Sequence, residues 1–187
     1  MTRRGFLSGL LALTIGSFLW RRGETAPPTS MNDIEKLQGN WKSFLAEGLK
    51  IPHPSEPLQL SKQQWSERLD PKQYHILREE GTERPWTSPL NNEKRAGIYT
   101  CAGCDLPLFT SEMKFDSGTG WPSFFTTIPG VFGTTTDYKL IWPRTEYHCI
   151  RCGGHHGHVF RDGPPPTGER WCNNGVALKF VPKNVNA

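Results

Sequence analysis

The sequence lacks both a long apolar run and an excess of charge of one sign in its main part. Its longest apolar stretch, residues 9–20, has twelve residues, whereas about 20 are needed to cross a bilayer as a helix. Residues 1–26 carry +3 of the net charge of +4, which leaves only +1 for the rest of the chain. A nearly neutral main part offers no basic stripe, so it does not match the pattern of a nucleic-acid-binding protein.

A large helical core is also disfavoured, because hydrophobic residues make up only 35% of the sequence. Glycine (19 residues) and proline (16 residues) are abundant instead, and they predict many turns and short strands. Aromatic residues, at 11%, can supply much of a compact core. The length of 187 residues suits one domain with appendages.

Residues 1–26 are expected to be a targeting segment. Arg3 and Arg4, in T-R-R-G-F-L, resemble the twin-arginine export motif of bacteria, and the short apolar run after them suits a signal peptide. A clean A-x-A cleavage site is missing, and Arg21 and Arg22 follow the run directly, so a cleaved signal and an uncleaved anchor both stay open. Either one predicts a location in the bacterial periplasm or at the outer face of the membrane, with membrane contact only through this segment.

Residues 27–60 are expected to be a linker and an N-terminal extension that packs on the surface of the main domain, residues 61–187. Apolar residues recur at near-helical spacing in residues 32–49, and three prolines predict an extended segment in residues 51–60. No chemistry is assigned to this extension.

Two helices are predicted at the start of the main domain, followed by short strands. Ser61, with a glutamine three residues later, is typical of a capping box, and Asp70 followed by proline is typical of a helix start. These helices should cover residues 61–69 and 70–80. Strand candidates lie at residues 98–100, 106–109, 134–142, 146–148, 158–160 and 176–181.

Four of the five cysteines form two Cys-x-x-Cys pairs, Cys101 with Cys104 and Cys149 with Cys152. Each pair lets two thiolates approach one ion from a tight turn, and two pairs complete a tetrahedron, which favours a structural zinc site with no vacant position. The 44 residues between the pairs exceed ordinary zinc-finger spacing, so the metal would join two distant hairpins of one domain. Two disulfides with one free thiol, or four reduced cysteines without metal, are the alternatives.

The fifth cysteine, Cys172, has the surroundings of a reactive thiol. If its segment is a strand, Arg170 and Asn174 lie on the same face as Cys172. A cation beside a thiol lowers its pKa and favours the reactive thiolate. The alternative is that Cys172 is a small buried hydrophobic residue.

Two histidines upstream of Cys172, His155 and His158, can return to it on an adjacent strand. His155 and His158 are candidates for a general acid or for holding a water molecule. Asp162 can orient a histidine or pair with Arg170. His156 is expected to be a solvated turn residue.

Trp121 follows two glycines in G-T-G-W-P-S-F, which suggests an accessible aromatic wall for a small ligand; a buried core tryptophan is the alternative. Together with both Cys-x-x-Cys pairs, the stretches D-S-G-T-G-W-P-S-F and H-x-G-H-V-F-x-D-G-P-x-P-T-G-E-R-x-C-x-N resemble the B-type peptide methionine sulfoxide reductases. The resemblance covers residues 61–182. It implies a mainly β fold with antiparallel sheets, N-terminal helices and a zinc site made of four cysteines, and reduction of the R epimer of methionine sulfoxide, chiefly in oxidised proteins and peptides.

The resemblance also implies roles for the site residues. Cys172 would attack the sulfoxide sulfur and become a sulfenic acid, with no organic cofactor. The other implied assignments are His155 and His158 at the sulfoxide oxygen through water, Asn174 positioning that network, Arg170 and Asp162 as charged residues lining the site, Trp121 at the substrate methyl group, and Cys101, Cys104, Cys149 and Cys152 as zinc ligands.

Three positions depart from the family pattern. Thr119 stands where some members carry a resolving cysteine, so we expect an external thiol such as thioredoxin to reduce the sulfenic acid directly. Gly175 replaces a common serine and is expected to loosen the site. His156 replaces a usually apolar residue.

Two other classes of function compete with the enzyme. One is a non-catalytic, zinc-bearing β-fold module that binds a ligand, which the polar neighbourhood of Cys172 argues against. The other is a zinc-ribbon nucleic-acid binder, which the near-neutral charge and the long separation of the cysteine pairs disfavour.

Overall fold

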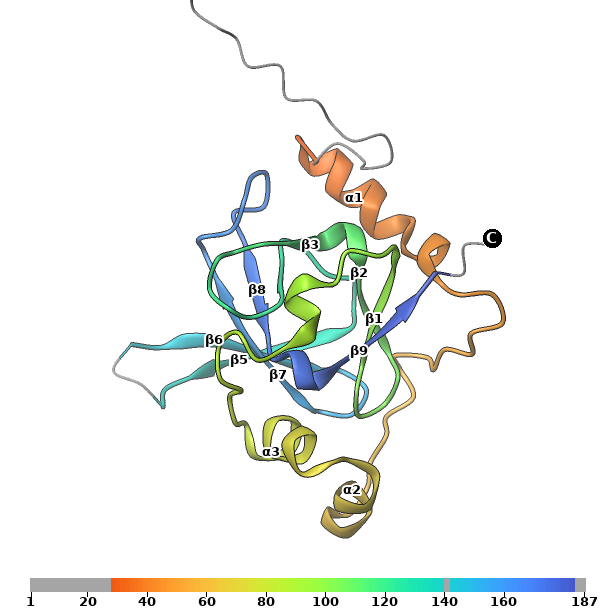
Figure 1. Cartoon of the computed structure of the whole chain (residues 1–187), viewed down its shortest axis with the longest axis vertical. Helices are drawn as coiled ribbons and strands as arrows, with labels where there is room; N and C mark the ends of the chain where they lie inside the picture. Colours follow the sequence, from red (N-terminus) through yellow and green to blue (C-terminus); the bar gives the residue numbers. More distant parts are fainter. Residues whose placement is uncertain (1–27, 140–141, 184–187) are drawn as a thin grey trace, which may run out of the picture.

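The computed structural model describes residues 28–139 and 142–183, so the predicted targeting segment lies outside the described residues. Two antiparallel sheets form the body of the molecule, and Figure 1 shows helix α1 at one end of them and helices α2 and α3 at the opposite end. The prediction of a mainly β fold with N-terminal helices is therefore confirmed. Within the described ranges, no helix has the length and apolar character needed to cross a membrane.

Two of the helices begin at the predicted caps, Ser61 and Asp70. The α-helices are α1 (Met31–Gly39), α2 (Lys62–Arg68) and α3 (Pro71–Glu79), and the short 3₁₀ helices are η1 (Trp41–Phe44), η2 (Pro89–Asn92), η3 (Ser111–Met113) and η4 (Gly175–Ala177). Ser61 forms a complete capping box at α2, and the Asp70 side chain accepts two backbone N–H groups at the start of α3. Such caps satisfy N–H groups that have no partner within the helix.

The N-terminal extension packs on the body, as predicted. Ile34 of α1 and Phe44 of η1 are buried. The side-chain amide of Gln38 donates to the hydroxyl of Thr126 (2.8 Å) and the carbonyl of Thr127 (3.2 Å). Helical structure in this region is shorter than expected, because α1 ends at Gly39 and only the 3₁₀ turn η1 follows.

In the part of the chain that the structure describes, nine strands make up the two sheets. The three-stranded sheet has the order β2 (Pro107–Thr110), β1 (Gly97–Cys101), β9 (Leu178–Pro182). The six-stranded sheet has the order β3 (Lys114–Phe115), β4 (Ser123–Phe124), β8 (Arg170–Asn173), β7 (His155–Phe160), β6 (Arg144–Cys149), β5 (Phe132–Asp137). The chain thus brings β8, which carries Cys172, between β4 and β7 in the middle of the larger sheet.

Aromatic side chains fill much of the core, as the composition predicts. Tyr99, Phe109, Phe124 and Tyr147 are fully buried. The rings of Phe109 and Phe124 stack with their centroids 3.9 Å apart, and Tyr99 meets Phe124 edge-on at 5.1 Å. Aromatic pairs of this kind add stabilisation beyond the area that they bury.

Strand register aligns five polar residues in one line across the larger sheet. Directly opposed pairs run from Ser123 to Cys172, from Cys172 to His158, from His158 to Glu146 and from Glu146 to Thr135. Directly opposed residues point their side chains to the same face of a sheet. We call Ser123, Cys172, His158, Glu146 and Thr135 the cross-strand row.

Gly157 lets β7 lie close to β8 beside this row. A Cβ atom at position 157 would overlap the carbonyl oxygen of Cys172. Any other residue would therefore push the two strands apart next to the nucleophile candidate.

Candidate active site and metal centre

The two Cys-x-x-Cys turns meet in the folded chain. The sulfur atoms of Cys101, Cys104, Cys149 and Cys152 all lie within 4.8 Å of one another and are buried. Sulfur separations of 3.6 Å (Cys101 to Cys152) and 3.5 Å (Cys104 to Cys149) are far longer than the roughly 2.05 Å of a disulfide. Thiolates at about 2.3 Å from a tetrahedral ion are about 3.8 Å apart. The donor set therefore fits a metal ion, and the alternative of two disulfides is wrong.

Three arginine side chains donate hydrogen bonds to backbone carbonyls of the two cysteine turns. Arg68 of α2 donates to the carbonyl of Gly103 (2.7 Å), and Arg78 of α3 donates to the carbonyl of Cys152 (2.8 Å). Arg151 donates to the carbonyl of Cys104 (3.1 Å). Four thiolates around a divalent ion leave a net charge of −2, so these cations also compensate the charge of the occupied site.

His156 is fully buried, so the prediction of a solvated turn residue is wrong. The cause is a bulge in β7: His155 faces His148, but Gly157 already faces Tyr147, and His156 is the extra residue. The bulge turns His156 to the core, where Nε2 lies 3.4 Å from the Cys101 sulfur and Nδ1 lies 3.3 Å from the Asn173 amide nitrogen.

The same bulge brings His155 and His158 to one face. In a regular strand, residues three apart point to opposite faces, but these two rings lie with their centroids 5.6 Å apart. Burial lowers the pKa of His156 to about 4, so this ring is neutral at neutral pH. His156 thus forms a polar connection between the metal centre and β8. His155 and His158 lie on the opposite face of β7.

Cys172 is half-buried in β8, directly opposite His158. The guanidinium of Arg170 makes two hydrogen bonds to Asp162, at 2.8 and 2.9 Å. Burial raises the pKa of the Cys172 thiol, and the charge of Arg170 and a hydrogen bond with Thr119 offset this effect only in part. Arg170 thus lowers this pKa, as expected, but burial has the larger effect, and the resting group is a thiol.

Thr119 belongs to a chain of hydroxyl groups beside Cys172. The Ser117 hydroxyl lies 2.8 Å from that of Thr119 and 2.7 Å from that of Ser123. Ser123 is the strand partner of Cys172 on the other side from His158. The position that the family resemblance connects with a resolving thiol is thus adjacent to Cys172 and supplies a hydroxyl.

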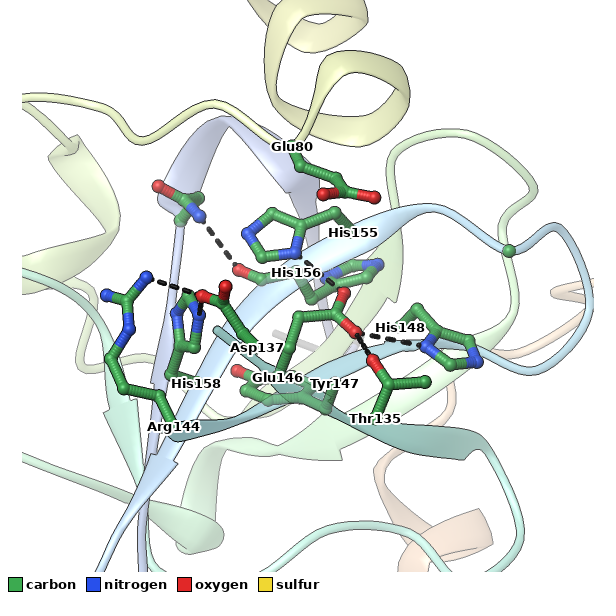
Figure 2. A network of polar contacts seen from close by, with 12 residues as sticks. Glu80, Thr135, Asp137, Arg144, Glu146, Tyr147, His148, His155, His156 and His158 are labelled. Carbon is green, nitrogen blue, oxygen red and sulfur yellow. Dashed lines mark hydrogen bonds and ion pairs between the residues drawn. The ribbon is translucent and has the colours of Figure 1, made fainter. Parts of the chain in front are cut away.

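Each active-site histidine is paired with a carboxylate that sequence reasoning missed (Figure 2). His155 Nδ1 lies 2.7 Å from Glu146 Oε1, and His158 Nε2 lies 2.8 Å from Asp137 Oδ2. Both acids occur in or beside predicted strands, but only the pairing of β5, β6 and β7 shows that they meet the histidines.

A cavity of about 430 Å³ opens onto these two pairs. It is lined by both histidines and both carboxylates, and Glu80 and Lys139 close part of its edge as an ion pair. The cavity therefore gives solvent access to the two histidines, and Cys172 is not among its lining residues.

Glu83, in the loop after α3, holds the predicted site residues Asn174 and Trp121 in place. Glu83 itself was not predicted from the sequence. Its backbone N–H donates to the Asn174 side chain (2.9 Å), and its carbonyl accepts the indole N–H of Trp121 (3.1 Å). The Asn174 amide also donates to the carbonyl of His156 (3.0 Å), so Asn174 ties this loop to β7. Trp121 is half-buried rather than a core residue.

Gly175 does not loosen this region, contrary to the expectation. Its N–H donates to the Glu83 carboxylate at 2.5 Å. A Cβ atom at position 175 would overlap the hydroxyl of Ser88. Ser88 therefore fills the space that a side chain at position 175 would take.

Comparison with known proteins identifies relatives over most of the described chain. Residues 69–182 match the family of the SelR domain. Peptide methionine sulfoxide reductase MsrB of Agrobacterium fabrum is 56% identical over 119 residues, which are 63% of this chain and 88% of the relative. The proteins of the same name from Pseudomonas putida and Methanosarcina barkeri are 53% and 50% identical, over 65% and 64% of this chain and 92% and 85% of the relatives.

The geometry of the four sulfurs predicts one divalent cation per chain. Metal binding at such sites contributes on the order of 10 kcal/mol, which is comparable to the net stability of a whole domain. A strong chelator should therefore release one ion and abolish the near-ultraviolet circular dichroism of the aromatic core. Native mass spectrometry checks the stoichiometry: Cys172→Ser should keep the ion and Cys104→Ser should lose it. A chain that stays folded and cooperative after metal removal would contradict this prediction.

Proposed function

The chain belongs to the SelR domain family, and from this premise we propose that it is an oxidoreductase that reduces methionine-R-sulfoxide in oxidised proteins and peptides to methionine. The observation that carries the proposal is the cross-strand row. A half-buried cysteine lies there opposite a histidine and beside the Arg170–Asp162 pair. The names of relatives at 50–56% identity support the same activity.

Cys172 is the nucleophile in this proposal. Its sulfur attacks the sulfoxide sulfur, whose bond to oxygen breaks as the oxygen takes up protons and leaves as water. Water then adds to the Cys172 sulfur and methionine departs. The net change is thiol plus sulfoxide to sulfenic acid plus methionine, in which the substrate sulfur gains two electrons and Cys172 loses two.

The thiol enters the reaction protonated because burial raises its pKa. Arg170 is held by Asp162 and stabilises negative charge on the Cys172 sulfur as the proton leaves. His155 and His158 face the oxygen through water and supply a proton to it.

Trp121 and Asn174 shape the site around the reacting atoms. The Trp121 indole is fixed through its N–H by the Glu83 carbonyl, which leaves its half-buried ring to receive the substrate methyl group. Asn174 acts as a positioning residue, since its hydrogen bonds hold Glu83 and the backbone of His156.

Zinc is the metal that we assign to the four cysteines. Four thiolates fill a tetrahedral site completely, which is typical of structural zinc, and the ion would supply cross-linking rather than a reaction step. It would join the turn after β1 to the turn between β6 and β7. Elemental analysis of the native protein identifies the ion, and a metal other than zinc contradicts the assignment.

The first prediction of this proposal concerns the epimers of the substrate. With dithiothreitol as reductant, the zinc-loaded protein should reduce a peptide that contains methionine-R-sulfoxide and leave the S epimer unchanged. Cys172→Ser should abolish turnover and keep the fold, which circular dichroism checks. No turnover by the wild type would leave a non-catalytic binding module as the function, and preference for the S epimer would contradict the assigned stereochemistry.

The second prediction concerns recycling of Cys172. The other four cysteines surround the metal, and Thr119 supplies no thiol, so an external thiol, of the thioredoxin kind, must reduce the sulfenic acid. After one turnover without reductant, mass spectrometry of dimedone-treated protein should find the label on Cys172 alone. The variant Thr119→Cys is the matched comparison and should give a disulfide instead. A disulfide from Cys172 to Cys101, Cys104, Cys149 or Cys152 in the wild type is the contrary result.

The third prediction concerns location. We propose that residues 1–26 direct export by the twin-arginine route to the periplasm or the outer face of the membrane, which the Arg3–Arg4 pair and the apolar run after it support. In a bacterial host, replacing both arginines by lysine should keep the protein in the cytoplasmic fraction. Equal export of wild type and variant would oppose the proposal, and N-terminal sequencing separates a cleaved signal from an anchor.

A further inference from the structure

Two partly buried acids behind the active-site histidines have no role in the mechanism above. Their side chains are 13% exposed (Glu146) and 9% exposed (Asp137), and their histidine partners are 4% exposed (His155) and 12% exposed (His158). Burying four ionisable groups in two pairs is costly unless each group is hydrogen-bonded. The arrangement is therefore not that of incidental surface contacts.

Each acid is held in place independently of its histidine. Glu146 accepts a second hydrogen bond from the Thr135 hydroxyl at 2.6 Å. Asp137 accepts from the Arg144 guanidinium at 2.5 Å and from the backbone N–H of Lys139 at 2.8 Å. Figure 2 shows Thr135 beside the Glu146 carboxylate and Arg144 beside the Asp137 carboxylate. Each acid is thus oriented by contacts other than the one with its histidine.

Both acids are ionised at neutral pH. Burial raises the pKa of Glu146, but hydrogen bonds from His155, Thr135 and His148 outweigh it and lower the value to about 2. The backbone N–H of Lys139 is the main cause that holds the pKa of Asp137 well below its usual range. An ionised carboxylate only accepts hydrogen bonds, so the ring nitrogen that faces it carries a hydrogen.

The two histidines use different ring nitrogens for these contacts. Glu146 meets Nδ1 of His155, whereas Asp137 meets Nε2 of His158. The nitrogens left for other partners are therefore Nε2 of His155 and Nδ1 of His158.

We propose that Glu146 and Asp137 are positioning residues that fix His155 and His158 in opposite tautomers, so that Nε2 of one ring and Nδ1 of the other face the substrate oxygen and its water. This inference rests on the proposed reductase function and adds to it. A carboxylate behind an imidazole also stabilises the imidazolium that forms when the ring takes a proton from solvent. The cavity that both pairs line supplies that solvent.

Titratable and charged groups approach the two rings from β5, β6 and β8 and from the segments after β5 and α3. Burial lowers the pKa of His158, and Asp137 raises it only in part, so loss of the Asp137 charge should lower it further. The groups facing the pair are Asp137 from β5, Lys139 after it, Arg144 and Glu146 from β6, Cys172 from β8 opposite His158, and Glu80 after α3.

The test compares Glu146→Gln and Asp137→Asn with Glu79→Gln. The control removes the charge of an exposed histidine–carboxylate pair, Glu79 with His75 at 3.0 Å, that lies outside the site. Long-range ¹H–¹⁵N correlation spectra of the histidine-labelled full chain should show Nδ1–H at His155 and Nε2–H at His158 in the wild type and in Glu79→Gln. Each site variant should lose the single tautomer at its own histidine.

Kinetics provide the second readout. Removing a partner that orients a metal-bound histidine typically changes activity by about 10- to 100-fold. By analogy, kcat for the R-sulfoxide peptide should fall by about that factor with KM nearly unchanged. In Asp137→Asn, the limb of the pH profile where activity is lost at high pH should move to lower pH, because the acid form of His158 is retained less well. If Glu146→Gln does not fold, Glu146→Asp keeps the charge but shortens the reach to His155 and should give the same loss of tautomer.

Unchanged tautomers, or unchanged kcat and pH profile in both site variants, overturn the inference. Wild-type protein that shows the expected tautomers but reduces no sulfoxide overturns the proposed function instead, so the two failures are distinguishable.

Discussion

Four buried sulfur atoms within 4.8 Å of one another would repel strongly as thiolates unless a cation stood among them. The rest of the molecule depends on how this requirement is met. The turn at Cys101 and Cys104 joins β1 to β2 in the small sheet, and the turn at Cys149 and Cys152 joins β6 to β7 in the large one. A metal at their meeting point would fix the two sheets to each other, and from Cys152 the chain passes directly into the strand that carries His155.

From that fixed point, strand geometry determines which side chains can act together. The bulge at His156 shifts the in–out alternation of side chains in β7 by one residue. His155 therefore lies on the same face as His158, whose strand partners are Cys172 and Glu146. Without the bulge, His156 and His158 would share a face and His155 would point away. One extra residue beside the metal turn therefore decides which two of three histidines reach the active site.

The sequence was sufficient to predict features that depend on neighbouring residues. The caps at Ser61 and Asp70, the two cysteine pairs and the closeness of Arg170 to Cys172 all follow from local spacing, and each was confirmed. Asp137 and Glu146 could not be found this way, because their contacts with the histidines arise from strand pairing.

The burial of His156 and the fit of Gly175 against Ser88 were mispredicted for a related reason. Both depend on the space left by residues distant in the sequence, and no local pattern reports that space. The effect of Arg170 on the pKa of Cys172 was predicted correctly, but burial, a property of the whole fold, outweighs it and could not be predicted from neighbouring residues.

The raised pKa has a consequence in the proposed cycle, in which Cys172 works without a resolving partner. Oxidants attack the thiolate rather than the thiol, so a thiol that ionises as it meets its substrate is protected from other oxidants between turnovers. Thr119 contributes to this balance, since its hydroxyl can assist ionisation of Cys172 but cannot form a disulfide with it.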